Sequence, residues 1–269
     1  MPHLEALDVF ETTPHEVSDF FARVAHAPSR VLLLDYDGTL APFSVDRHRA
    51  APYPAIPALL DRIRNSTNTR LVVVTGRRAY EAAVLLGLRN IEVWGCHGLS
   101  RLHSDGTYEL PYLDEAAVGQ ISEANRMLRQ QGLFDLLEFK PGATAIHWRG
   151  MDSAATQVAQ GVEKVWSRLR SHKGLQLLKF DGGMEIRVAG RNKSDVVRTV
   201  LAEMGSNSAA AYLGDDHTDE DAFEALRGHG LSVLVRHEYR PTIADAWIQP
   251  PDGVIAFLAD WADACGGAS

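Results

Sequence analysis

Cysteine is scarce in this sequence, basic side chains are outnumbered, and long apolar runs are absent. The 269 residues include two cysteines, Cys96 and Cys265, in no metal-binding spacing, so we predict neither a disulfide framework nor a zinc motif. With 27 Lys and Arg against 35 Asp and Glu, the formal net charge of −8 argues against broad nucleic-acid binding. No segment approaches the roughly 18 apolar residues of a membrane span, and the N-terminus has no signal-peptide core. We therefore expect a soluble, cytoplasmic protein with no nucleic-acid or membrane partner, and a monomer is the default expectation.

The apolar residues that are present follow the rhythm of a parallel α/β sheet. Continuous apolar runs at 31–35, 70–76 and 91–95 read as strands that are covered on both faces. Amphipathic helical patterns separate them, with Gly87 near the end of the second. A strand–helix–strand–helix–strand order predicts a doubly wound, Rossmann-like parallel sheet.

The pattern changes after about residue 104 and resumes near 193. Between these points the sequence predicts helices, each followed or preceded by a hairpin, as in "LLEFK-PGA-TAIHWRG" and "LQLLKF-DGG-MEIRVAG". We therefore predict a core domain of residues 1–104 plus 189–269, with an α+β unit over 105–188 inserted into it.

Polar side chains follow three of the predicted strands at the point where each strand ends. The first strand ends in Asp35 and Asp37, the second in 75–77 (Thr-Gly-Arg), and a later one in Asp215 and Asp216. Carboxyl ends of parallel strands meet at one edge of a sheet, where ligands bind. Carboxylates so close together repel unless a cation sits among them, and a hard divalent ion such as Mg²⁺ suits oxygen ligands beside phosphate. The alternative is that each aspartate only caps a helix or begins a turn.

Four ordered segments carry a resemblance to a known family. "DYDGTL", "TGR", Lys193 at the start of a helix and "GDDHTDEDAF" resemble the four motifs of the haloacid dehalogenase-like phosphohydrolases. The resemblance covers the whole chain, and it implies a Rossmann-like core with an inserted cap and phosphoryl transfer through an aspartyl-phosphate.

The resemblance also implies residue roles. Asp35 would be the nucleophile, and Asp37 would protonate the leaving oxygen and later take a proton from water. Thr75 would hold the phosphoryl oxygens, and Lys193 would neutralise charge. The Mg²⁺ ligands would be Asp35, Asp37 through its carbonyl, Asp215 and, close behind, Asp216. For Asp219 two interpretations remain open, namely support of the metal shell and a partner of the helix dipole.

A finer resemblance joins "LLLDYDGTLAPF", "HG" at 97–98, "EFKPGATAIHWR", "MEIR" and "GDDHTDEDAF" to the trehalose-6-phosphate phosphatases. It implies a cap that closes over trehalose 6-phosphate as the substrate. The substrate-binding residues that we predict on this basis are Gly76, Arg77, His97, Gly98, Lys140, His147, Arg149 and Glu185. The sequence departs from the family pattern at Ser100, Trp148 and Ser194.

Two other functions stay open. The same chemistry could act on sucrose phosphate, a glycosyl-phosphoglycerate or another sugar phosphate. A non-catalytic sugar-phosphate sensor is the alternative from another class, but such a protein is expected to have lost at least one of Asp35, Asp37, Lys193 or Asp215, and all four are present.

Overall fold

The chain folds into two compact units. The computed structural model describes residues 14–44, 46–148, 151, 154–169, 172–180, 182–205 and 207–266. The first unit joins residues up to 109 with residues from 191 onward, and the second comprises residues 110–190. The first boundary lies beyond the predicted 104/105 because β5 (Tyr108–Glu109) pairs with β4 (Ser100–Leu102) in the sheet of the first unit. The division of roles between the two units stays a prediction.

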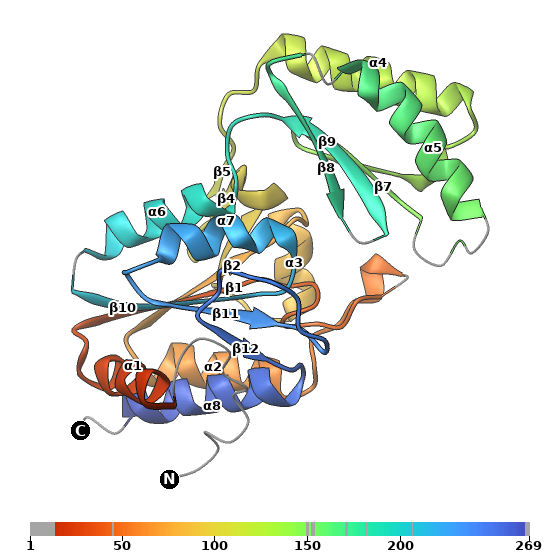
Figure 1. Ribbon diagram of the computed structural model, residues 1–269. Coiled ribbons are helices and arrows are strands. Elements are labelled where there is room, and N and C mark those ends of the chain that lie inside the picture. The colour runs from red at the N-terminus through yellow and green to blue at the C-terminus, as the bar shows by residue number, and fades with distance from the viewer. Residues whose placement is uncertain are drawn as a thin grey trace. The chain divides into compact units, whose positions relative to one another are not determined.

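An eight-stranded sheet in the order β12-β11-β10-β1-β2-β3-β4-β5 forms the centre of the first unit (Figure 1). The strands from β12 to β3 run parallel, and β4 and β5 add an antiparallel hairpin at one edge. The remaining bounds are β1 Ser29–Leu34, β2 Thr69–Val74, β3 Glu92–Gly95, β10 Ser208–Gly214, β11 Leu231–Val235 and β12 Ala246–Ile248. This is the doubly wound arrangement that the apolar runs predict.

Helices cover both faces of this sheet. Along β1, Leu32 and Leu34 belong to the apolar core beneath one helical layer, while Val31 and Leu33 belong to the core beneath the other. The first layer contains α1 (Pro14–His26), α2 (Ile56–Ser66), α3 (Ala79–Leu86) and α8 (Asp252–Gly266), and the second contains α6 (Lys193–Met204) and α7 (His217–Leu226). Burial on both faces explains why the strand reads as an unbroken apolar run rather than an alternating one.

The parallel register brings the polar strand ends together. Leu34 of β1 pairs with Leu213 of β10 on one side and with Val73 of β2 on the other. The backbone N–H of Asp35 then donates to the Leu213 carbonyl at 2.9 Å, one residue before β10 ends. Residues directly after β1, β2 and β10 therefore lie at one edge of the sheet.

The second unit is a four-stranded antiparallel sheet in the order β6-β7-β9-β8 with two helices on one face. Its elements are α4 (Glu115–Gln130), β6 (Leu137–Lys140), β7 (Ala143–His147), α5 (Ala154–Trp166), β8 (Leu175–Phe180) and β9 (Gly183–Val188). Apolar residues of α4 and α5, among them Leu128, Val162 and Trp166, pack against Ile146 and Ile186 of the sheet. None of the helices that the structure describes, in either unit, combines the length and the apolar character that crossing a membrane requires.

Candidate active site

Asp35 directly follows the buried strand β1 and is itself only 4% exposed. The chain turns at once, because the N–H groups of Leu40 and Ala41 donate to the Tyr36 carbonyl at 2.9 and 3.0 Å. Gly38 occupies a left-handed conformation (φ +89°), and a Cβ there would stand 2.4 Å from Oδ2 of Asp215. Only glycine fits this approach, so the turn places the loop backbone directly against a second carboxylate.

Lys193 joins two of the acids. Its Nζ donates to Oδ1 of Asp35 at 2.6 Å and to Oδ1 of Asp219 at 2.7 Å, with a side chain 3% exposed. The position is fixed by a capping box at the start of α6, where the Asn192 side chain accepts from the N–H groups of Ser194 and Asp195. A well-capped helix start therefore holds the ammonium group rigidly beside the predicted nucleophile.

Asp219 lies inside the cluster and is fully buried. Besides Lys193, it accepts from the hydroxyl of Tyr212 at 2.7 Å and from the backbone N–H of Asp216 at 3.0 Å. A Cβ at Gly214 would stand 2.4 Å from its Cγ, so the end of β10 has to be glycine for this carboxylate to fit. Asp219 accepts from the N-cap backbone at the start of α7 and also from Lys193, so it lies both at the helix start and in the charged cluster, and its support of a metal shell stays a prediction.

The cluster concentrates negative charge out of water. One carboxylate oxygen from each of Asp35, Asp215 and Asp219 lies within 4.8 Å of the other two. Burial, together with the neighbouring acid Asp219 and against the pull of Lys193, raises the pKa of Asp35 to about 7. Burial and the neighbouring carboxylates likewise raise the pKa of Asp215 well above its ordinary value. For Lys193, burial alone would lower the pKa, but the carboxylates of Asp219 and Asp35 raise it.

The donor set fits a hard divalent cation. Oδ2 of Asp215 is buried and has no hydrogen-bond partner among the described residues. A buried carboxylate oxygen in that state is costly unless a cation takes the place of the missing donor. Asp216, predicted as a metal ligand, instead accepts from the N–H of His217 at 2.8 Å as the N-cap of α7, and its metal role stays a prediction.

Asp37 has a different environment from Asp35. Its side chain is 28% exposed, and both of its oxygens accept from Arg77, Oδ1 from Nη2 at 2.6 Å and Oδ2 from Nε at 2.7 Å. The predicted metal contact of Asp37 is through its backbone carbonyl, so this ion pair leaves that prediction open. Sequence reasoning missed the Asp37–Arg77 pair, since nothing in the spacing of two motifs indicates which side chains meet.

The loop after β2, which we predict to hold phosphate, is held in place by the segment after β3. Thr75, 1% exposed, accepts through Oγ1 from the N–H of Arg77 at 3.1 Å, and its carbonyl accepts from the N–H of His97 at 2.9 Å. Cys96 and His97 both have positive φ values (52° and 57°), which costs conformational energy at non-glycine residues. A Cβ at Gly76 would stand 2.7 Å from the His97 ring, so ring and loop pack directly.

Three further positions singled out in the sequence, namely Gly98, Ser194 and Ser100, are buried or packed near this region. At Gly98 (φ +99°) a Cβ would stand 2.9 Å from the Asn192 carbonyl, just before Lys193. Ser194 donates through Oγ to Oδ1 of Asn192 at 2.6 Å and so strengthens the cap of α6. Ser100 is fully buried, and its hydroxyl has no hydrogen-bond partner within the described chain. The substrate-binding roles of Gly76, Arg77, His97 and Gly98 stay predictions.

The second unit has a charged cluster of its own on its sheet. Lys140 donates to Oε2 of Glu185 at 2.7 Å and lies 3.7 Å from Oε2 of Glu138. His147 lies 2.8 Å from the same Glu138 oxygen. The structure thus brings together three of the predicted cap residues and adds Glu138, which the sequence did not single out; Arg149 lies outside the described residues, and Trp148 packs against the apolar core of the unit.

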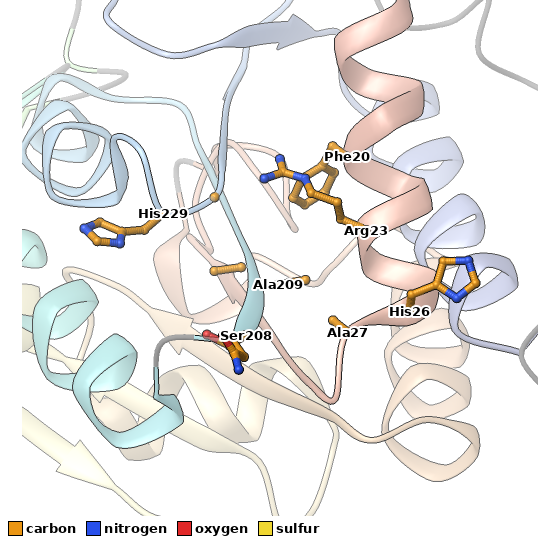
Figure 2. A pocket seen from close by; sticks show the side chains of 10 residues that line it. Phe20, Arg23, His26, Ala27, Ser208, Ala209 and His229 are labelled. Carbon is orange, nitrogen blue, oxygen red and sulfur yellow. The ribbon is translucent and has the colours of Figure 1, made fainter.

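A cavity of about 300 Å³ lies at the opposite end of the first unit's sheet (Figure 2). Phe20 and Arg23 of α1 and Ser208, the first residue of β10, are among its lining residues. The charged cluster instead follows Gly214, the last residue of β10. The cavity is therefore separate from the candidate site.

The architecture is that of the haloacid dehalogenase-like hydrolases. A haloacid dehalogenase-like hydrolase from B. subtilis superposes with a TM-score of 0.58 at 14% identity, over 86% of this chain and 99% of that one. The C-terminal domain of C. albicans trehalose-6-phosphate phosphatase superposes with a TM-score of 0.80 at 18% identity, over 95% of this chain and 99% of that one.

Sequence comparison narrows this class to one family. The trehalose-phosphatase family model matches residues 33–246, and the chain belongs to that family. It is 28% identical to a trehalose-phosphate phosphatase of Mycobacterium marinum over 243 residues, and 27% identical to a probable trehalose-phosphate phosphatase of Oryza sativa over 256 residues. These matches cover 86% and 85% of this chain but 60% and 64% of the two relatives.

Proposed function

We propose that this chain is a Mg²⁺-dependent phosphatase that hydrolyses trehalose 6-phosphate to trehalose and phosphate. The observation that carries the proposal is the pair of unlike carboxylates on one turn, the buried Asp35 held by Lys193 and the partly exposed Asp37 held by Arg77. Two acids in separate environments can serve as nucleophile and as proton carrier in one reaction. Membership of the trehalose-phosphatase family supports the substrate class.

In the proposed reaction, an oxygen of Asp35 attacks phosphorus while the bond from phosphorus to the sugar oxygen breaks. The Asp37 carboxyl group gives its proton to that leaving oxygen. A water molecule then attacks phosphorus in the aspartyl-phosphate and loses a proton to Asp37, which releases phosphate and regenerates Asp35. Lys193 bonds one oxygen of Asp35 throughout, and the rigid loop at Thr75 offers its hydroxyl to the phosphoryl oxygens.

Asp35 and Asp215 are the residues that would hold Mg²⁺, with the backbone carbonyl of Asp37 as a further ligand. When bound, the ion supplies positive charge beside the phosphoryl group and its nucleophile. The buried, unpartnered Oδ2 of Asp215 supports this assignment. Asp219 serves chiefly to hold Lys193, because its oxygens already accept from Lys193, Tyr212 and the Asp216 backbone.

We further propose that the charged cluster of the second unit binds the sugar. Lys140 offers an ammonium donor and Glu138 and Glu185 offer carboxylate acceptors, which form stronger hydrogen bonds to sugar hydroxyls than neutral groups do, and His147 adds an imidazole ring. A sugar whose hydroxyl groups do not match the spacing of these side chains forms fewer hydrogen bonds with them, which gives the cluster its selectivity.

A panel of phosphorylated sugars tests the substrate. Phosphate release is measured with trehalose 6-phosphate, sucrose phosphate, a glycosyl-phosphoglycerate and glucose 6-phosphate, each with Mg²⁺ and with a chelator. We expect trehalose 6-phosphate to be preferred at least about 10²-fold in kcat/KM, and chelation to stop turnover. Equal rates on all four sugars would overturn the substrate assignment, and full activity in chelator would overturn the metal assignment.

The Asp35→Asn variant tests the aspartyl-phosphate chemistry and separates an enzyme from a sensor. We expect the variant to release no phosphate while it still binds trehalose 6-phosphate. A regulatory protein can share this fold, as the C-terminal domain of a Candida albicans trehalose synthase regulatory protein does at a TM-score of 0.70. Binding by the wild-type protein without turnover of any phosphorylated sugar would favour that second function.

A further inference from the structure

The contacts of Arg77 account for nearly all of its hydrogen-bonding capacity. Nε and Nη2 donate to the two oxygens of Asp37 at 2.7 and 2.6 Å. Nη1 donates to the Arg47 carbonyl at 2.6 Å and to Oε1 of Glu81 at 3.0 Å. A guanidinium group carries five N–H donors, so these contacts occupy four of them. Little hydrogen-bonding capacity remains with which Arg77 could bind the substrate directly, the role that the family resemblance implied.

Arg77 is also held in place along its whole length. Its side chain is 10% exposed and lies over the ring of Tyr36, 5.5 Å from the centroid. Its carbonyl accepts from the N–H of Cys96 at 2.7 Å, and a Cβ at Gly95 would stand 2.8 Å from that carbonyl oxygen. Because neighbours hold both its backbone and its guanidinium group, Arg77 can hold the side chain of Asp37 in one orientation.

The two parallel hydrogen bonds from Arg77 to Asp37, here called the fork, leave part of the Asp37 carboxylate available to another molecule. A carboxylate oxygen has two lone pairs, and the parallel N–H bonds from Arg77 use one on each oxygen. The remaining lone pairs of Asp37 can be reached from solvent, because its side chain is 28% exposed, whereas the side chain of Asp35 is 6% exposed. Asp37 can therefore exchange a proton with another molecule while Arg77 still holds its plane.

We propose that Arg77 is a positioning residue whose two-point fork sets the orientation of the Asp37 carboxyl group for proton transfer. This inference rests on the proposed function, in which Asp37 gives a proton to the sugar oxygen as the phosphorus–oxygen bond breaks and regains one from water. A carboxyl group that rotates freely spends little time aligned with that oxygen, and misalignment slows transfer steeply. Arg77 touches neither phosphorus nor the leaving group in this scheme.

The choice of leaving group tests the inference. p-Nitrophenolate leaves without a proton, whereas the sugar oxygen needs one, so Arg77→Ala should affect the two substrates differently. We expect kcat on trehalose 6-phosphate to fall about 10²-fold and kcat on p-nitrophenyl phosphate to fall less than about 5-fold. KM for both substrates should stay within about 3-fold. Added guanidinium should restore part of the loss, and Arg77→Lys, with one contact point, should lie between wild type and Arg77→Ala.

Two controls keep the result interpretable. Glu81→Gln leaves the fork on Asp37 in place, so its kcat should change less than about 3-fold. In an Asp37→Asn background, Arg77→Ala should lower turnover of trehalose 6-phosphate no further, because its effect passes through the missing acid.

Three outcomes would overturn the positioning role. An equal loss on both substrates without guanidinium rescue would assign Arg77 to fold stability, and a raised KM for both would assign it to phosphate binding. Additive losses in the double variant would separate it from Asp37. If wild-type protein turns over p-nitrophenyl phosphate but no phosphorylated sugar, the proposed function fails, and a loss of more than about 5-fold on p-nitrophenyl phosphate in Arg77→Ala would still contradict this inference separately.

Discussion

Each unit of the molecule places a lysine between two acids, yet the two clusters differ in charge. Lys193 of the first unit lies 2.6 and 2.7 Å from its two carboxylates, and Lys140 of the second lies 2.7 and 3.7 Å from its pair. The first cluster contains a third buried carboxylate, Asp215, whose Oδ2 has no hydrogen-bond partner among the residues that the structure describes. The second contains His147 beside Glu138, a group that can add positive charge.

This difference indicates what each cluster can bind. An excess of buried negative charge is unstable by itself and becomes favourable when a divalent cation enters, and that cation also offsets the charge of a phosphoryl group. In the second cluster each of the two acids already has a basic side chain at hydrogen-bond distance, so no cation is needed, and the donors and acceptors suit neutral hydroxyl groups. The same lysine–acid contact therefore serves phosphoryl chemistry in one unit and, in our proposal, sugar recognition in the other.

Among the changes that test the difference between the two clusters, Lys193→Met should have the largest effect on activity. It removes the only ammonium group that the structure places on Asp35 among the described residues, so we expect kcat to fall about 10²- to 10³-fold on trehalose 6-phosphate and on p-nitrophenyl phosphate alike. Steady-state phosphate release measures it. Lys179→Met is the matched control, because its 2.9 Å pair with Glu163 is exposed and should matter little. A loss below 10-fold would remove Lys193 from the catalytic centre.

Lys140→Met should give a smaller and more selective effect. Loss of a charged hydrogen-bond donor should lower kcat/KM for trehalose 6-phosphate about 10- to 100-fold, mainly through KM. Turnover of p-nitrophenyl phosphate, which has no sugar, should be unchanged. An equal loss on both substrates would mean that the two clusters are not divided between chemistry and recognition.

The smallest expected effect is on thermal stability, measured as the rise in Tm on adding Mg²⁺ at two pH values. Because burial raises the pKa of Asp35 from 3.8 to about 7, its contribution to stability is present below pH 3.8 and is lost as the pH rises through 7. The metal-free protein is thus penalised more at pH 8 than at pH 5, and Mg²⁺ relieves that penalty. We expect the rise in Tm on adding Mg²⁺ to be about 2–4 °C larger at pH 8 than at pH 5.

Asp215→Asn is the control for this measurement, since it removes a proposed ligand and should abolish the Mg²⁺ response at both pH values. An equal response at pH 5 and pH 8 in the wild-type protein would contradict the link between the metal and the buried carboxylates.

Sequence patterns predicted the parallel sheet because strands covered on both faces are unbroken apolar runs with polar residues at their ends. The position of Asp35, and of Asp215 near it, follows from that rule and from the parallel register. β4 and β5 were missed because strands of three and two residues carry no readable periodicity.

Side-chain partners were beyond the reach of sequence patterns. The hydroxyl of Tyr212 on Asp219 depends on how α7 starts relative to β10, and the fork of Arg77 on Asp37 joins two loops 40 residues apart. Glu138 was missed because an acid in an alternating hairpin has the pattern of an ordinary solvent-facing residue. Only the register across β6, β7 and β9 brings Glu138 and Lys140, both on β6, into one cluster with Glu185.

The pairing of β1 with β10 has a consequence for how the molecule is made. The two strands align from Ser29 with Ser208 to Leu34 with Leu213. During synthesis β1 therefore cannot pair with β10 until residues 208–213 have left the ribosome. Until then one edge of a strand with four consecutive apolar residues (31–34) lacks its partner, a state prone to association with other chains. The second unit, whose strands pair only with one another, can fold in the meantime. The buried charges of the first unit meet only after that, so the nascent chain is spared their repulsion until the sheet that holds them is complete.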